Sequence, residues 1–186
     1  MSPIRPAAFL DRDGTIIADV HHIRRADDVV LLPGAAAAIA RLNAAGIPVV
    51  VVTNQSGIAR GFFDLDAYEL VRARIDELLA RHAARIDASY LCPHHPQITG
   101  PCDCRKPGTL LYRRAADDLD LDAAHSAFVG DRWRDVAPAH ALGGRGILIQ
   151  GSSTPVEERA RAEHEARVLT SLSAAVDHLL GSYWRR

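Results

Sequence analysis

The sequence predicts an α/β fold with a mostly parallel sheet. Short apolar runs that are typical of buried strands alternate along the chain with segments whose apolar residues follow helical spacing. Polar residues come directly after several of these runs, which is where open parallel sheets carry their chemistry. The alternation favours a Rossmann-like sandwich of three layers, with helices on both faces of the sheet. A length of 186 residues fits one domain, and we expect residues 1–186 to form it.

The strands are predicted from short apolar runs. The clearest is Val49-Val50-Val51-Val52, because four β-branched residues in a row suit a strand that is buried on both faces. The other runs are bounded by glycine, aspartate or other polar residues. Together they predict strands at residues 7–10, 48–52, 88–91, 126–129 and 146–150, and a very short one at 167–169.

The helices between these strands are predicted from their end signals. Pro33 and Gly34 open an alanine-rich helix that Gly46 ends. Asp64 or Asp66 can cap the next helix, in which the apolar residues follow helical spacing. The same reasoning predicts helices at 33–46, 64–82, from 107 through 112, at 136–142 and on both sides of 167–169, with irregular loops at 19–28 and 92–106.

The composition argues against several classes of partner. A formal net charge of -1 does not favour binding to nucleic acid. No apolar run is long enough to cross a bilayer, and residues 1–6 lack the apolar core of a signal peptide. A cytoplasmic location follows as the default, with neither a nucleic acid nor a membrane as partner. We also expect a monomer that acts on a small molecule, although the composition does not decide the oligomeric state.

Two carboxylates, Asp11 and Asp13, follow the first predicted strand. Side chains of an extended segment repeat every second residue, so both are expected to lean the same way. Close carboxylates repel unless a cation or a shared proton lies between them. Taken alone, the segment is equally well interpreted as a polar turn at Asp13-Gly14. The rest of the chain decides between a turn and a site.

Other predicted strands also end in polar residues. Thr53 and Asn54 follow the second strand, and Asp131 follows the fourth. Because the carboxyl ends of parallel strands share one edge, these side chains should meet in one crevice, which Lys106 is close enough to join. Carboxylates bind Mg²⁺, whereas a hydroxyl, an amide and an ammonium donate to phosphate oxygens. The set predicts phosphoryl transfer, in which positioning and charge neutralisation dominate.

Four groups of polar residues in this sequence resemble, in the same order, the four motifs of the haloacid dehalogenase-like phosphatases. They are Asp11-Arg12-Asp13-Gly14-Thr15, Thr53-Asn54, Lys106, and Gly130-Asp131 with Asp135. The resemblance implies that Asp11 is the nucleophile, which forms an aspartyl-phosphate, and that Asp13 is the general acid and base. It also implies that Mg²⁺ binds the carboxylates of Asp11 and Asp131 and the backbone carbonyl of Asp13.

In the same family, residues at the positions of Thr53 and Lys106 hold the phosphoryl oxygens and complete the catalytic set. Asp135 is expected to orient Lys106 or to support the metal through water. A helix N-cap with an acidic first turn is the alternative interpretation of Asp131 and Asp135.

A second cluster lies in Cys92-Pro93-His94-His95 and Cys102-Asp103-Cys104. Thiolates and imidazole at close spacing suit tetrahedral Zn²⁺. Cys92, His94, Cys102 and Cys104 provide four ligands and no open position, which predicts a structural zinc. Free buried thiols, a disulfide between two of the cysteines, and His95 in place of His94 are the alternatives.

The cysteine loop and the run from Thr53 to Gly61 are similar to the branch of this family that acts on heptose bisphosphates. That resemblance implies removal of the 7-phosphate of D-glycero-D-manno-heptose 1,7-bisphosphate, in nucleotide-activated heptose biosynthesis for lipopolysaccharide, by an enzyme without a cap domain. His22 stands where a tyrosine is expected and Arg132 where a lysine is common. By the same resemblance the substrate contacts are Asp19, His22, Thr53, Asn54, Gln55, Ser56, Arg105, Lys106 and Arg132.

Three other functions are compatible with parts of the pattern. A histidinol-phosphate phosphatase, or a broader sugar-phosphate phosphatase, would share the motifs and the zinc loop. A phospho-acceptor signalling domain is also a parallel α/β fold, but it would carry its acceptor aspartate after a later strand, where this chain has Thr53. A catalytically silent module stabilised by zinc would need only the cysteine loop.

Overall fold

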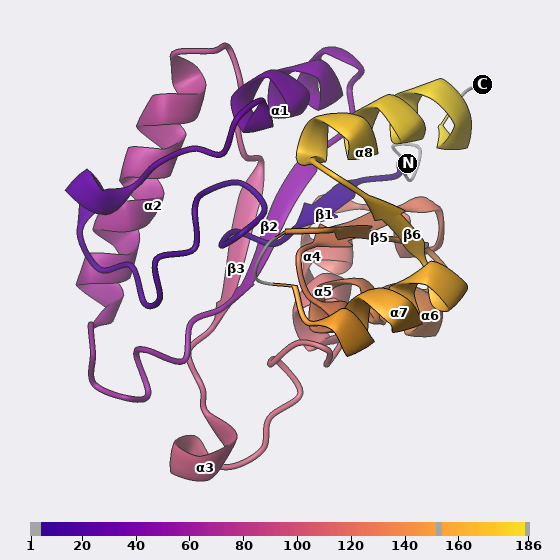
Figure 1. Cartoon of the computed structure of the whole chain (residues 1–186). Helices are drawn as coiled ribbons and strands as arrows, with labels where there is room; N and C mark the ends of the chain where they lie inside the picture. The colour runs from indigo at the N-terminus through magenta and orange to yellow at the C-terminus, as the bar shows by residue number, and fades with distance from the viewer. Residues whose placement is uncertain (1–4, 152–153, 185–186) are drawn as a thin grey trace.

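Six parallel strands form one sheet in the order β3-β2-β1-β4-β5-β6 (Figure 1). The computed structural model describes residues 5–151 and 154–184. Every predicted strand is present, so the expected α/β sandwich is confirmed. The strands are β1 Ala8–Leu10, β2 Val49–Asn54, β3 Ala88–Cys92, β4 Ala127–Gly130, β5 Arg145–Ile149 and β6 Arg167–Leu169.

Alternate side chains of the strands face opposite layers of helices. Leu10 belongs to one buried core and Phe9 to the other, as the period of two requires. The Leu10 face is covered by α1 (Ala35–Ala44), α2 (Leu65–Ala80) and α8 (Leu172–His178). The other face is covered by α4 (Leu110–Leu119), α5 (Trp133–Val136), α6 (Pro138–Leu142) and α7 (Val156–Glu165). Helices therefore shield both faces of the sheet from water, which explains why the strand sequences are continuously apolar and do not alternate with polar residues.

Two helical segments differ from the prediction. The helix expected at 136–142 begins earlier and is divided into α5 and α6, because Pro138 has no N–H to continue the bonding of α5. The loop expected to be irregular at 92–106 contains a short helix, α3 (Pro96–Thr99), which projects from the end of the sheet (Figure 1). The strand β2 runs on to Asn54, because Thr53 and Asn54 keep pairing with β3.

The order of the strands creates a crevice beside β1. From β1 the chain goes to β2 and β3 on one side of the sheet, and then returns to β4 on the other side of β1. Ligands of open α/β sheets bind at such a switch point, outside the carboxyl ends of the strands. Asp11 and Asp13 follow β1 and Asp131 follows β4, so the predicted site residues lie at this point.

The C-terminal segment packs onto the domain. A π-helical turn, Leu179–Tyr183, continues α8, and the indole Nε1 of Trp184 donates to the carbonyl of His125 at 2.8 Å. Residues 185–186, at the end of this tail, lie outside the described residues, as do 1–4, where no signal peptide is expected, and 152–153. Among the described helices none has both the length and the apolar character needed to span a membrane.

Candidate active site

Lys106 and Asp11 form a buried ion pair at the carboxyl end of β1. The Lys106 Nζ donates to Asp11 Oδ1 at 2.6 Å and to the carbonyl of Val52 at 2.7 Å. It also lies 2.7 Å from Asp135 Oδ1. Burial by itself lowers the pKa of Lys106, but the attraction of Asp11 and Asp135 outweighs it, so the pKa is raised and the amine stays charged.

The two carboxylates that contact this lysine form a cluster with a third, Asp131. Oxygen atoms of Asp11, Asp131 and Asp135 lie within 4.8 Å of one another, and all three residues are buried. Burial, followed by repulsion from Asp11 and Asp135, raises the pKa of Asp131 to about 7. Arg132 and Arg134 lie near the edge of the cluster, at 3.5 Å from Asp131 and 3.9 Å from Asp135. Three buried carboxylates are hard oxygen donors, so the cluster fits Mg²⁺ by its donor chemistry.

Asp135 combines two functions that the sequence offered as alternatives. Its Oδ2 accepts a hydrogen bond from the backbone N–H of Arg132 at 3.0 Å, which caps the first turn of α5. Its Oδ1 pairs with Lys106. The cap therefore fixes the carboxylate that faces the lysine.

The second aspartate, Asp13, is not part of the carboxylate cluster and has hydrogen-bond partners of its own. Its carboxylate receives two hydrogen bonds from the guanidinium of Arg12, at 3.0 and 3.1 Å. The amide of Gln55 donates to Asp13 Oδ2 at 2.9 Å and to Thr53 Oγ1 at 2.7 Å. Asp13 thus belongs to a polar network with Thr53, while Asp11 belongs to the charged network with Lys106.

Residues on β2 and in the cysteine loop also fix the position of Lys106. The Asn54 side chain exchanges two hydrogen bonds with the backbone of Lys106, through Oδ1 at 3.0 Å and Nδ2 at 3.2 Å. Arg105 donates from Nη1 to the carbonyl of His94 at 3.2 Å. The predicted substrate residue Asn54 therefore holds the lysine in this structure, and Arg105 is tied to the cysteine loop.

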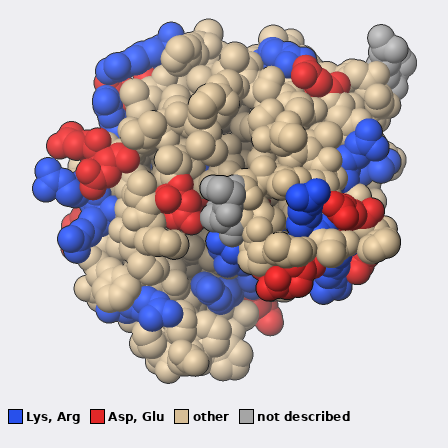
Figure 2. All heavy atoms as spheres, in the orientation of Figure 1, with Lys and Arg blue, Asp and Glu red and all other residues tan. Residues whose placement is uncertain are grey.

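The remaining predicted substrate residues lie on segments that follow β1, β2 and β4. Asp19 and His22 are exposed on the loop after β1, and the His22 ring lies 4.9 Å from the Phe62 ring. Ser56 is half-buried after β2. Arg132 Nε lies 3.5 Å from Asp131 Oδ2. In Figure 2, in the same orientation as Figure 1, basic side chains gather between the centre of the face and the α3 segment.

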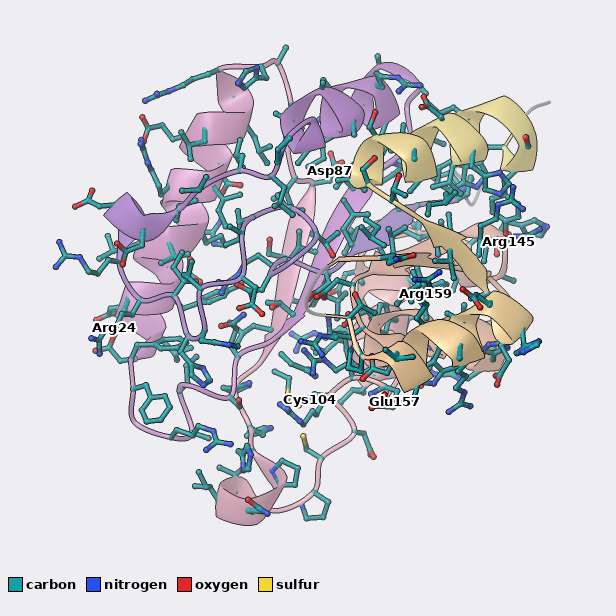
Figure 3. All side chains as sticks on the ribbon, viewed as in Figure 1. Arg24, Asp87, Cys104, Arg145, Glu157 and Arg159 are labelled. Carbon is teal, nitrogen blue, oxygen red and sulfur yellow. The ribbon has the colours of Figure 1, made fainter. Side chains whose placement is uncertain are left out.

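The three cysteines meet one histidine beside the crevice. Cys92, His94, Cys102 and Cys104 offer ligand atoms that all lie within 4.8 Å of one another. The Cys104 sulfur lies 2.9 Å from that of Cys92 and 3.3 Å from that of Cys102, too far for a disulfide bond. His94 Nδ1 is 3.2 Å from the Cys104 sulfur. Figure 3 labels Cys104, which lies between the sheet and the α3 segment.

The neighbouring histidine points elsewhere. His95 Nε2 lies 2.7 Å from Nη2 of Arg60, a residue of the loop after β2. The structure thus places His94, and not His95, in the cluster. A set of three thiols and one imidazole without an open position fits a structural zinc by its donor chemistry.

Sequence reasoning did not assign a function to Arg12. The residue is only 3% exposed although it is a full cation, and it contacts the carboxylate of Asp13. The signal was available, because a charged residue directly after a buried strand and between two carboxylates needs a partner. Asp135 was predicted as a support of the lysine or the metal, and its carboxylate lies within the cluster itself.

Known proteins are similar to this chain in sequence over most of its length. A curated relative from Escherichia coli O6:H1 is 37% identical over 92% of this chain and 94% of its own, and one from Rhodopseudomonas palustris is 42% identical over 83% and 89%. Both are named D-glycero-beta-D-manno-heptose-1,7-bisphosphate 7-phosphatase. The chain belongs to this heptose bisphosphate phosphatase family. Two family models agree, one described as haloacid dehalogenase-like hydrolase at residues 8–70 and one as HAD-hydrolase-like at 103–175.

Solved structures of the heptose bisphosphate phosphatase family have the same fold. D,D-heptose 1,7-bisphosphate phosphatase from B. bronchiseptica, complexed with magnesium and phosphate, is 36% identical and superposes with a TM-score of 0.85 over 95% of this chain and 98% of its own. The corresponding enzyme from Burkholderia thailandensis is 31% identical, with a TM-score of 0.71 over 96% and 100%.

Proposed function

We propose that this chain is a magnesium-dependent phosphatase that removes the 7-phosphate of D-glycero-D-manno-heptose 1,7-bisphosphate. Its relatives carry this name, and the reaction is a phosphoric monoester hydrolysis. The observation that carries the proposal is the pairing of Asp11 with Lys106 inside a group of three buried carboxylates. A nucleophilic carboxylate, a fixed cation and a metal site are what phosphoryl transfer to a protein side chain requires.

In the first half of the reaction, Asp11 attacks phosphorus and the bond from phosphorus to the sugar oxygen breaks. Asp13 gives its proton to that oxygen, so the sugar leaves as an alcohol. Thr53 and Lys106 hold the phosphoryl oxygens through their O–H and N–H groups. The product on the protein is an aspartyl-phosphate at Asp11.

In the second half, Asp13 accepts a proton from water, which attacks the same phosphorus and frees Asp11. Magnesium would be held by Asp11, Asp131 and the backbone carbonyl of Asp13. When bound, it supplies positive charge that reduces the repulsion between the carboxylates and the phosphate. Asp135 keeps Lys106 directed toward Asp11, as its position 2.7 Å from the amine suggests.

The cysteine loop acts as a wall of the pocket in this proposal. Zinc held by Cys92, His94, Cys102 and Cys104 would fix the segment that carries Arg105 and Lys106. Arg105, with Asp19, His22, Ser56 and Arg132, would then contact the sugar or its second phosphate, a task for which guanidinium is suited. The whole chain would work as one domain.

A panel of substrates tests the proposal. Phosphate release is measured with the α and β anomers of heptose 1,7-bisphosphate and with histidinol phosphate, with Asp11→Asn as the inactive reference. We expect one heptose anomer to have the highest kcat/KM and Asp11→Asn to release no phosphate. A higher kcat/KM for histidinol phosphate would overturn the substrate, and full activity of Asp11→Asn would overturn the nucleophile.

A further inference from the structure

We propose that Arg12 is a positioning residue that holds Asp13 so that it can deliver a proton from one defined oxygen, Oδ1. This inference rests on the proposed function, because it takes Asp13 as the general acid. It concerns a buried residue to which the proposed reaction assigns no contact with the substrate.

Arg12 contacts Asp13 through two hydrogen bonds, one to each carboxylate oxygen, in the forked arrangement typical of guanidinium and carboxylate groups. Arg12 Nε donates to Asp13 Oδ2 at 3.1 Å, and Nη2 donates to Oδ1 at 3.0 Å. Two parallel hydrogen bonds between planar groups fix the plane of the carboxylate, which a single bond would leave free to rotate. The Arg12 side chain is 4% exposed and that of Asp13 is 24% exposed. The buried guanidinium of Arg12, called the clamp below, therefore holds a carboxylate that is partly open to solvent.

The arginine is itself held in place. Its guanidinium carbon lies 5.7 Å from the centre of the Tyr68 ring, which is a cation–π distance. Tyr68 is a buried residue of α2, 2% exposed. The clamp therefore connects a helix of the domain to the side chain that exchanges the proton.

Counting the acceptor positions of Asp13 identifies the reactive oxygen. A carboxylate offers about four lone-pair positions, two on each oxygen. Oδ2 accepts from Arg12 Nε and from Gln55 Nε2, so both of its positions are in use. Oδ1 accepts only from Arg12 Nη2 among the described residues, which leaves one position for a proton.

The clamp also favours the direction of the transfer. When the Oδ1 proton passes to the sugar oxygen, the phosphorus–oxygen bond breaks, Asp11 becomes bonded to phosphorus, and Asp13 becomes a carboxylate. Three N–H donors already point at that carboxylate, and they stabilise its charge as it develops without any need to move.

The dependence on the leaving group tests this inference. An alkyl phosphate, such as glycerol phosphate, needs a proton on its leaving oxygen, whereas p-nitrophenyl phosphate releases a stable anion and needs little help. We expect Arg12→Lys, which keeps the charge and loses the fork, to lower kcat/KM for the alkyl ester by about 10- to 100-fold, since general acid catalysis contributes about 10²–10⁴-fold. The loss for the aryl ester should be less than about threefold, because its leaving group requires no acid.

Two further variants keep the experiment decisive. Gln55→Met removes the third donor to Asp13 and should also lower the ratio of alkyl to aryl kcat/KM, so it answers the question if Arg12→Lys does not fold. Arg72→Lys is the matched control, because Arg72 pairs with Glu69 and Asp76 on the solvent face of α2. It should leave both rates unchanged.

A double variant distinguishes positioning from general damage. Arg12→Lys placed in an Asp13→Asn background should cause no further loss of the ratio, because the acid it positions is gone. Equal losses for both esters in Arg12→Lys and Gln55→Met, or a further fall of the ratio in the double variant, would overturn the inference. If the wild type hydrolysed both simple esters but no heptose bisphosphate, the proposed substrate would fail while the inference on Arg12 could still be decided.

Discussion

Gly14 lies so close to Asp131 that a Cβ on Gly14 would be 2.6 Å from Asp131 Oδ2. The glycine also has a φ of +76°, which side-chain-bearing residues rarely adopt. The turn after Asp13 thus needs glycine for two separate reasons, one conformational and one steric. The steric reason concerns a carboxylate that we assign to magnesium.

Gly14→Ala is expected to lower both stability and catalysis. The left-handed backbone should cost about 1–2 kcal/mol of unfolding free energy, and the displaced Asp131 should lower kcat by about 100-fold. Gly46→Ala is the matched control, because Gly46 has a φ of +71° and a Cβ added to it would meet no atom within 4 Å. It should lose similar stability, measured by urea unfolding, with unchanged kcat and unchanged magnesium dependence. Equal kinetic effects in both variants would contradict the steric argument.

Lys106→Met is expected to leave the carboxylates without their buried counter-charge. Removal of one partner from a buried ion pair costs about 3–5 kcal/mol, so the melting temperature should fall in magnesium-free buffer. Added magnesium should recover part of that loss because it binds the same oxygens. The kcat should fall by about 10²–10³-fold at saturating magnesium, since a donor to the phosphoryl group is lost. An unchanged melting temperature without magnesium would argue against the charge balance described for the site.

The raised pKa of Asp131 predicts a dependence of stability on pH. The pKa is about 7 in the folded protein, against about 3.9 in an unfolded chain. Between these values the folded state binds more protons, so the contribution of Asp131 to stability falls as the pH rises from about 4 to about 7. Without added magnesium, Asp131→Asn should show a flatter decline of unfolding free energy than the wild type over this range. Parallel curves for the two proteins would show that Asp131 does not titrate in this way.

The two neighbouring histidines should differ in metal binding. His94 faces the thiols and His95 faces Arg60, so His94→Gln should lose bound zinc while His95→Gln keeps about one equivalent. Elemental analysis of the purified variants measures this directly, and Cys102→Ser should behave like His94→Gln. Zinc retained in His94→Gln, or a fully folded wild type that contains no zinc, would contradict the assignment.

The layered fold followed from the sequence because its strands are buried on both faces and read as continuous apolar runs. Val49 to Val52 are the clearest case, because their strand β2 lies between β1 and β3 and is buried on both faces. The helix α3 has only four residues, too few to produce a periodic pattern, so its existence depends on the surrounding loop. The break at Pro138 carried a local signal, the missing N–H, which the apolar pattern of the segment concealed.

That certain residues lie together was predictable where polar residues follow strand ends, as at Asp11, Asp131 and the cysteine loop. The contacts between individual side chains could not be predicted from the sequence. The spacing of residues in the sequence does not predict that Gln55 donates to both Asp13 and Thr53. It also does not predict the paired hydrogen bonds from Arg12 to Asp13. Whether His94 or His95 joins the thiols likewise depends on the backbone direction after Cys92, which two adjacent histidines cannot reveal.

Lys106 is the only lysine in the chain, and it is 3% exposed. Every other member of the Lys and Arg set in the sequence is an arginine, so the ε-amine of Lys106 is the only lysine side chain that an acylating or cross-linking reagent can label, and it lies among carboxylates. The α-amine of the chain also reacts with such reagents, so the labelled Lys106 is distinguished from it by peptide mapping. Lys106 becomes reactive only when the crevice opens or the domain unfolds. The rate at which Lys106 is labelled therefore reports the opening of the catalytic centre itself, with no background from lysines elsewhere.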